Sequence, residues 1–346
     1  MRSTKTLLNI AVIAGFFGAA PPAMAGGDVN VYSYRQPELI QPALDAFSRK
    51  AGIAVNLLFL DKGMIERMRI EGENSPVDVL LTVDIARLDD LKQAGLTQAL
   101  ADAAVDQAIP EKFRDPDRQW FGLTMEPRAI YAARDRVRQE AFTYEELADP
   151  KWKGRLCLRD GQHSSNLGLF ADMIATHGAA DVGKWLTGVK ANLARRPSGS
   201  DLNQAQAIAE GQCDIALGNT TVIATMLADD SPPEEKKWAG AIRVILPTAG
   251  DRGSYVNISG MALARYAPNR DNAVKLMQFL ASKDAQETYA GDTLDYPIAA
   301  GAEPADILKR FGVLKPDPVP MSDILKYRQQ ASELVDKAGF NDGPGE

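Results

Sequence analysis

The sequence predicts an α/β protein of two lobes joined by a hinge, with a ligand cleft between the lobes. Short apolar runs typical of strands alternate with amphipathic helical patterns over most of the 346 residues. A chain of this length exceeds one comfortable hydrophobic core, which favours two domains. The pattern also changes from one α/β set to a second near residues 124–128 and leaves that set near residues 250–257. The chain is thus expected to pass from one lobe to the other and back, and two such connections permit hinge closure around a ligand.

The first predicted elements are a strand, a helix and a second strand. Residues 29–32 form a short apolar run that stops at polar residues, and the apolar spacing over residues 39–47 predicts a helix after it. A second apolar run covers residues 53–60. Ligands of open α/β sheets bind at the ends of such strands, so we expect the polar residues after the first strand to face the cleft.

Further strands alternate with helices along the chain, and we expect them to form a parallel sheet arrangement. Pro268 suits a helix start, and the apolar spacing that follows it predicts a helix over residues 269–283. The predicted strands cover residues 29–32, 54–59, 78–82, 129–132, 155–158, 214–217, 242–246 and 258–264.

The crossings divide the mature chain into two lobes. Lobe 1 is expected to be discontinuous and to comprise residues 26–126 and 257–305, and lobe 2 to be the inserted residues 127–256. Residues 306–346 are expected to form a helical segment that packs on lobe 2.

The N-terminus carries the pattern of an export signal. Arg2 and Lys5 form a basic region, and residues 7–20 are apolar but too short and too rich in small residues to span a bilayer comfortably. Residues 23–25 read Ala-Met-Ala, which is a cleavage signal. We therefore predict cleavage near Ala25 and a periplasmic mature protein. The alternative is an uncleaved membrane anchor.

The net charge disfavours polyanionic partners. The formal charge of the whole chain is −7, and loss of Arg2 and Lys5 with the signal makes it −9, because residues 1–25 contain no acidic residue. We therefore expect neither nucleic acid nor an anionic membrane surface as a partner.

The two cysteines, Cys157 and Cys213, both lie in apolar strand-like runs. In an oxidising compartment they can pair if those strands are neighbours. The sequence does not set the distance between them, so a disulfide and two buried free thiols both stay open.

Four blocks of sequence point to a family. Residues 75–88, 120–124, 144–155 and 253–260 resemble, in order, the ferric-iron-binding proteins of ABC importers, and the resemblance runs from about residue 29 to 297. It is closest to the cyanobacterial type. The resemblance implies a type II periplasmic-binding-protein fold and a monomeric receptor that delivers its solute to a membrane permease with a cytoplasmic ATPase.

The sequence departs from that family where the metal is held. Gln36 and Pro37 stand where the family usually has a His-Tyr or similar pair after the first strand. Thr221 and Val222 stand where it has paired tyrosines, and a further family tyrosine falls on Ala132, one position from Tyr131. Ferric ion prefers anionic oxygen donors, so we expect bound iron to arrive with a chelator or synergistic anion and we expect no resident cofactor. The weak candidates for a protein metal ligand are Asp84, Tyr131 and His163.

The residues at the expected cleft positions are polar and suit an oxyanion. A helix that starts with Ser164 and Ser165 presents backbone N–H groups, and Arg35 and Arg128 offer guanidinium groups to a carboxylate or phosphate. The alternatives are structural: the serines and Asp84 as helix caps, and the arginines as partners of Asp84, Asp160 or Glu126. The candidate ligand-binding residues are Ser33, Tyr34, Arg35, Gln36, Thr82, Asp84, Arg128, Ser164, Ser165, Asn166, Asn219, Thr220, Thr221 and Tyr255.

The sequence therefore predicts a periplasmic solute-binding protein for ferric iron or an iron-chelate or iron-anion complex. Two alternatives remain: import of a metal-free organic anion such as a sugar phosphate, phosphonate or carboxylate, and a receptor that feeds a sensor. We expect no enzyme, because no nucleophile elbow, zinc-protease, phosphate-loop or dinucleotide-binding motif is present.

Overall fold

The structure is a computed structural model that describes residues 27–247 and 252–344. The predicted export signal, residues 1–25, lies outside the described residues. In the part of the chain that is described, no helix has the length and apolar character needed to cross a membrane.

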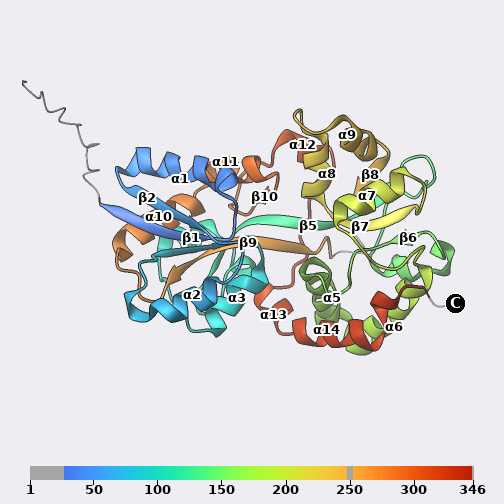
Figure 1. Ribbon diagram of the computed structural model, residues 1–346, viewed down its shortest axis with the longest axis horizontal. Coiled ribbons are helices and arrows are strands. Elements are labelled where there is room, and N and C mark those ends of the chain that lie inside the picture. The colour runs from blue at the N-terminus through green and yellow to red at the C-terminus, as the bar shows by residue number, and fades with distance from the viewer. Residues whose placement is uncertain (1–26, 248–251, 345–346) are drawn as a thin grey trace, which may run out of the picture.

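Two α/β lobes lie side by side, and two long strands connect them (Figure 1). Strand β5 (Phe121–Ala133) pairs with β9 (Val256–Ala264) over residues 121–127 and with β7 and β8 over residues 128–133. The strand order is β2-β1-β3-β9-β5-β7-β6. The other strands are β1 (Asp28–Ser33), β2 (Ala54–Phe59), β3 (Val79–Thr82), β4 (Thr97–Gln98), β6 (Leu156–Cys157), β7 (Ile215–Asn219), β8 (Ile242–Ile245) and β10 (Tyr296–Pro297).

Helices cover the sheets of both lobes (Figure 1). In the part of the chain before β7 they are α1 (Pro37–Ala51), α2 (Met64–Glu71), α3 (Ile85–Gln93), α4 (Ala103–Ala108), α5 (Ser164–His177), α6 (Ala179–Asn192) and α7 (Asp201–Ala209). After β7 they are α8 (Thr220–Leu227), α9 (Pro233–Gly240), α10 (Arg270–Ala281), α11 (Lys283–Thr293), α12 (Asp306–Lys309), α13 (Met321–Leu325) and α14 (Arg328–Lys337).

The expected parallel arrangement is wrong for the two connecting strands. Strand β1 is parallel to β2 and β3, and β6 is parallel to β7, but β9 is antiparallel to both β3 and β5. The reason is topological: β5 carries the chain out of the first lobe and β9 brings it back, so the two run in opposite directions. The sheet is therefore mixed.

Strand β5 is also much longer than the predicted strand at residues 129–132. Its first half contains the polar residues Thr124 and Glu126 and then Pro127, which break the apolar pattern that signals a strand. Proline has no N–H for the ladder, yet Pro127 still lies opposite Val256 of β9. Pro127 thus stands at the point where β5 passes from one set of partners to the other.

Helix α1 shows how local sequence builds the predicted elements. Pro37 occupies the first turn, where a missing N–H costs nothing, and Gly52 ends the helix with a left-handed φ of 68° while its N–H bonds to the carbonyl of Ser48. The face that carries Ile40 and Leu44 is buried against the sheet. The strand-helix-strand start of the chain is therefore confirmed.

The C-terminal segment packs mainly on α5 and α6, which belong to the inserted lobe. Helix α14 contacts α5 and α6, and α13 contacts α5 and α3. The buried ring of Phe340 lies 6.1 Å from the ring of Phe170 on α5, measured between ring centroids. Arg252 adds a polar link, because its Nη2 atom lies 2.9 Å from Asp172 of α5 and 2.7 Å from Asp317.

Close packing between β5 and β7 gives a testable constraint on the fold. A Cβ atom at Gly218 would lie 2.2 Å from Cζ of Tyr131, whose side chain is fully buried. We expect Gly218→Ala to lower the free energy of unfolding by about 1–3 kcal/mol, because the buried ring has to move. Urea unfolding measures this. Gly291→Ala in α11 is the matched control, since no atom lies within 4 Å of its Cβ, and it should be neutral or slightly stabilising. Equal effects at the two sites would contradict the packing argument.

Candidate functional site

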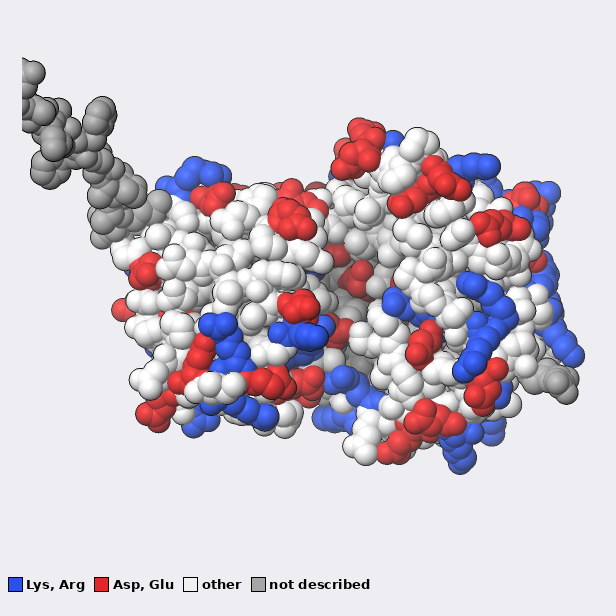
Figure 2. All heavy atoms as spheres, viewed as in Figure 1, with Lys and Arg blue, Asp and Glu red and all other residues white. Residues whose placement is uncertain are grey.

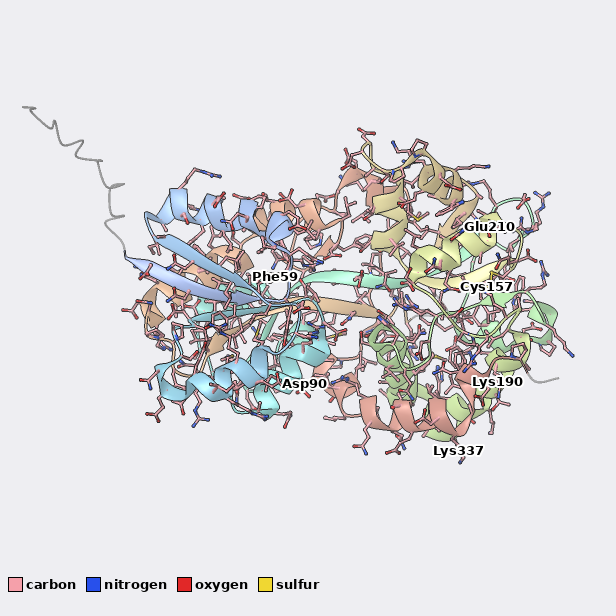
Figure 3. The ribbon with its side chains drawn as sticks, in the orientation of Figure 1. Phe59, Asp90, Cys157, Lys190, Glu210 and Lys337 are labelled. Carbon is pink, nitrogen blue, oxygen red and sulfur yellow. A yellow bond between two sulfur atoms is a disulfide. The ribbon has the colours of Figure 1, made fainter. Side chains whose placement is uncertain are left out.

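A cavity of about 680 Å³ lies between the two lobes. Lobe 1 contributes the segment after β1 and the start of α3, and lobe 2 contributes the starts of α5, α7 and α8. Figure 2 shows the groove between the lobes, with acidic and basic side chains along it. Phe59, at the end of β2, is 38% exposed and lines the cavity on the lobe 1 side (Figure 3). The volume of the cavity is within the range of small-molecule binding sites.

The structure brings many of the predicted ligand-binding residues together at this cavity. They come from both lobes and from strand ends or helix starts, as expected for an open α/β sheet. The predicted residues that line the cavity are Tyr34, Arg35, Gln36, Asp84, His163, Ser164, Ser165, Asn219 and Thr221.

The other candidates lie behind the cavity wall. They are buried, and the contacts below show that several of them support residues of the wall. Ser33 accepts a hydrogen bond from the backbone N–H of Arg35 at 2.9 Å. Tyr255 packs its hydroxyl over Gly168, where a Cβ atom would lie 1.9 Å away. The structure therefore does not place at the cavity wall the following candidates: Ser33, Thr82, Arg128, Tyr131, Asn166, Thr220 and Tyr255.

Arg128 is fully buried in lobe 2, and protein groups bind both of its terminal nitrogens, while its buried Nε atom has no hydrogen-bond partner among the described residues. Its Nη1 atom donates to Asp201 at 2.6 Å and to Asn219 at 2.8 Å, and its Nη2 atom donates to Asn166 at 2.7 Å. Burial alone would raise the pKa of the Asp201 carboxyl, but the guanidinium groups of Arg128 and Arg159 hold that pKa below its usual value. Arg128 thus positions Asn219 in the cavity wall.

Tyr131, a candidate metal ligand, is also directed away from the cavity. Its side chain is fully buried, and its hydroxyl donates to the carbonyl of Asn219. Burial raises the pKa of Tyr131 well above its usual value, with Asp201 adding to the effect. An ionised phenolate is therefore disfavoured at this position.

Arg35 reaches the cavity but has protein partners. Its Nη2 atom lies 3.2 Å from Oδ2 of Asp295, and its Nε atom donates to the hydroxyl of Tyr289 at 3.0 Å. The other oxygen of Asp295 accepts a hydrogen bond from Thr221 of α8 at 3.0 Å. Because Asp295 precedes β10 and Thr221 belongs to lobe 2, this pair links the two lobes across the cavity.

The start of α5 forms one wall. His163 caps the helix, with its Nδ1 atom accepting from the backbone N–H of Ser165 at 3.2 Å. Burial, together with Arg159 and Arg128, lowers the pKa of His163. A neutral imidazole therefore caps the helix, and Ser164 and Ser165 line the cavity at its positive dipole end.

Asp84 caps the opposite helix. One of its oxygens accepts from the backbone N–H of Ala86 at 2.7 Å, and the other accepts from the amide of Asn257 at 3.0 Å. The capping alternative considered for Asp84 thus describes its contacts in this structure.

Several residues of the cavity were missed by sequence reasoning. Arg159 lies two residues after β6, and its Nη1 atom is 3.4 Å from Asp201, while its buried Nε atom has no hydrogen-bond partner among the described residues. The guanidinium carbon of Arg87 lies 4.1 Å from the centroid of the Tyr34 ring. Glu126, considered only as a partner for an arginine, lines the cavity as well. The strand-end rule, applied to the predicted strand at 155–158, would have found Arg159.

Carboxylates line the cavity, but those in the described part of the chain are not grouped as metal ligands. Within residues 27–247 and 252–344, no group of three or more His, Cys, Asp or Glu side chains is arranged to hold a metal ion. Tyr34 is the one tyrosine among the described residues that line the cavity. A hard trivalent cation bound here would need most of its anionic oxygen donors from another molecule.

The sequence is similar to a known family and to iron-uptake proteins. A family model for bacterial extracellular solute-binding proteins matches residues 74–325. Iron uptake protein A2 of Synechocystis is 36% identical over 316 residues, covering 90% of each chain. The major ferric iron-binding protein of Neisseria meningitidis serogroup B is 25% identical over 347 residues, covering 97% of this chain and 99% of that protein.

Solved structures are similar over nearly the whole chain. The ferric iron-binding protein A of Mannheimia haemolytica in an open conformation has a TM-score of 0.88 and 44% identity, covering 91% of this chain and 99% of that one. A Trichodesmium protein in complex with iron and citrate ligands has a TM-score of 0.87 and 36% identity, covering 91% of this chain and 100% of that one.

Proposed function

The chain belongs to the family of bacterial extracellular solute-binding proteins, and on that premise we propose that it is the receptor of an ABC importer for ferric iron carried with a small anionic chelator. The names of its relatives support ferric iron as the cargo. The Trichodesmium structure is a complex with iron and citrate ligands, which supports a chelator. The role is binding and delivery rather than catalysis.

The observation that carries the proposal is the anion-binding wall formed by Arg159 and the start of α5. Arg159 is partly buried, keeps only a 3.4 Å contact with Asp201, and lines the same cavity as Ser164 and Ser165. A guanidinium group and the positive dipole end of a helix both attract carboxylates. A chelator whose carboxylates contact this wall would hold the ferric ion inside the cavity.

The chelator is an essential part of the proposal, because the described residues offer no grouped set of metal ligands. Ferric ion is a hard cation that prefers carboxylate or phenolate oxygen. The described carboxylates that line this cavity are not grouped to supply three such oxygens. Thr221 and Val222, at the positions where the family has paired tyrosines, supply no phenolate. The chelator would supply the missing oxygens.

Capture would proceed by closure of the lobes. The proposed moving bodies are residues 26–126 with 257–305, and residues 127–256 with the C-terminal segment 306–346. Strands β5 and β9 would act as the hinge, since they are the connections between the sheets. In this proposal the protein is exported, loses residues 1–25, acts as a monomer and delivers its ligand to a permease and its ATPase.

A metal-free organic anion is the second candidate cargo. It is favoured by one observation, namely that the described residues offer no group of three metal ligands. The same wall of Arg159 and α5 would bind the phosphate, phosphonate or carboxylate of such a solute.

Replacement of Arg159 tests the anion-binding wall. We expect Arg159→Gln to weaken ferric citrate binding by about 10- to 100-fold, because a charged hydrogen bond contributes roughly 1.5–3 kcal/mol. Titration calorimetry measures the affinity. Arg265→Gln is the control, since Arg265 is exposed and donates to the carbonyl of Gly95 outside the cavity; it should bind like the wild type.

Two results would contradict the proposal in different ways. Unchanged affinity in Arg159→Gln would remove the anion-binding wall from it. Wild-type protein that is purified from the periplasm without iron, and that binds metal-free citrate or a sugar phosphate more tightly than ferric citrate, would favour the metal-free candidate.

A further inference from the structure

Glu126 occupies a distinctive place in the cavity. It lies on β5 opposite Asn257 of β9, one residue before β5 changes its strand partners. Side chains alternate along a strand, so Thr124, Glu126 and Arg128 project to one face. Thr124 contacts Asp295 at 2.8 Å on one side, and Arg128 contacts Asp201 at 2.6 Å on the other. Glu126 is thus placed between two acidic residues.

Those two flanking carboxylates are already neutralised by protein groups. Asp295 pairs with Arg35 at 3.2 Å, and Asp201 pairs with Arg128 at 2.6 Å and with Arg159 at 3.4 Å. Glu126 differs, because no Lys, Arg or His among the described residues lies within ion-pair distance of it. Other carboxyls of the cavity wall, Asp84 and Glu235 among them, likewise have no ion pair among the described residues, but Glu126 is the one that lies on β5, between the lobes.

The surroundings of Glu126 disfavour its negative charge. Burial raises its pKa to about 7, and Asp295 and Asp201 act in the same direction, whereas Arg35 and a hydrogen bond from Asn219 oppose the shift. The Asn219 oxygen accepts from Arg128 at 2.8 Å, which leaves the Asn219 amide nitrogen to donate to Glu126. The hydrogen bond from Asn219 of β7 orients the carboxyl, and the charged groups that act on it lie on α7, before β10 and after β1.

We propose that Glu126 is a cation-binding subsite, whose carboxylate contacts the positive centre of the bound solute while Arg159 and the start of α5 hold its anionic part. The subsite rests on the proposed function, in which that centre is the ferric ion of the chelate. An ammonium group on a zwitterionic solute has the same chemistry. Either way the ligand is bipolar, and it binds at the point where β5 joins the lobes.

Proton release should accompany binding. Below about pH 7 the carboxyl of Glu126 in the empty cavity carries a proton, which a cationic centre must displace. Affinity should therefore rise with pH, by at most about 10-fold per unit, and level off above the pKa. In the ligand-free protein the sign is opposite: a carboxyl whose folded pKa is raised loses its contribution to stability as pH rises through about 7.

The test compares the wild type with Glu126→Gln, which keeps the shape and removes the charge. The probes are ferric citrate and, as a metal-free zwitterion, β-alanine, each titrated between pH 5.5 and 8. We expect Glu126→Gln to bind ferric citrate at least 10-fold more weakly at pH 8 and to lose the difference between low and high pH. Glu234→Gln, on the exposed first turn of α9, should behave as the wild type. Because citrate and iron titrate too, the comparison is made between variants in identical buffers.

Each remaining outcome decides one part of the inference. If the wild type binds ferric citrate and Glu126→Gln binds it equally well at every pH, the subsite is overturned and the proposed function stands. If the wild type binds only β-alanine and Glu126→Gln does not bind it, the subsite is supported and the assignment of iron as the cargo is contradicted. A wild type that binds neither probe overturns both. The ligand-free variant, measured by thermal unfolding, should be at least as stable as the wild type at pH 8, which separates lost binding from misfolding.

Discussion

Replacing Arg128 with methionine is expected to lower the free energy of unfolding by about 3–5 kcal/mol. Arg128 is fully buried, and its guanidinium donates to Asp201, Asn219 and Asn166. Its removal leaves the Asp201 carboxylate, which is 2% exposed, with the longer 3.4 Å contact to Arg159 as its ion pair and a 3.0 Å hydrogen bond from the backbone N–H of Asn219. Urea unfolding of the ligand-free protein measures the loss.

Two further variants give this prediction its controls. Arg134→Met should change stability by well under about 1 kcal/mol, because Arg134 is exposed and bonds only to the carbonyls of Gly240 and Ile242. Adding Asp201→Asn to Arg128→Met should recover part of the loss, because the uncompensated charge is then gone. A loss below about 1 kcal/mol in Arg128→Met would mean that Arg159 and the backbone N–H of Asn219 satisfy Asp201 without Arg128.

Removal of the disulfide between Cys157 and Cys213 is expected to cost about 4 kcal/mol, from the loop-entropy relation for a separation of this length. The bond joins β6 to the residue two positions before β7, with 5.9 Å between the Cα atoms and 56 positions between the cysteines. Figure 3 shows Cys157 in the lobe that carries β6 and β7. Thermal and urea unfolding of Cys157→Ala with Cys213→Ala measure the cost.

The reduced wild type is the control for the disulfide. Both cysteines are buried, so the alanine pair also removes some packing, and reduced protein separates that part from the cross-link. Oxidised and reduced wild type of equal stability would contradict the prediction. The open question of pairing is resolved by the sheet, because β6 and β7 are parallel neighbours.

Much of the fold follows from local sequence signals. Apolar runs correctly locate strands such as β1, β2 and β3, and Pro268 with the spacing after it correctly indicates α10. The first half of β5 is not recognisable in this way, because it does not face a uniform core. Glu126 lines the cavity, Thr124 donates to Asp295, and Pro127 stands where β5 changes its strand partners. A strand whose pattern is set by its neighbours in space carries little signal in its own residues.

The residues of the candidate site likewise fall into those that the sequence places correctly and those that it does not. Residues directly after a strand, such as Tyr34 and Arg35, or at a helix start, such as Ser164, are found in the cavity because chain order alone places them at the edge of the sheet. Arg128 and Tyr131 are within a strand, and which way a buried side chain turns there depends on partners elsewhere in the chain.

The sequence by itself determined the family, the two-lobed α/β fold and the polar residues at the strand ends. Only the tertiary structure decided which arginine of lobe 2 lines the cavity. Arg128 is held away from the cavity by Asp201, 73 positions further along the chain, and Arg159 takes its place in the wall. The physical reason is that a buried charge needs a counter-charge, and the fold brings that counter-charge to Arg128 but leaves Glu126 without one.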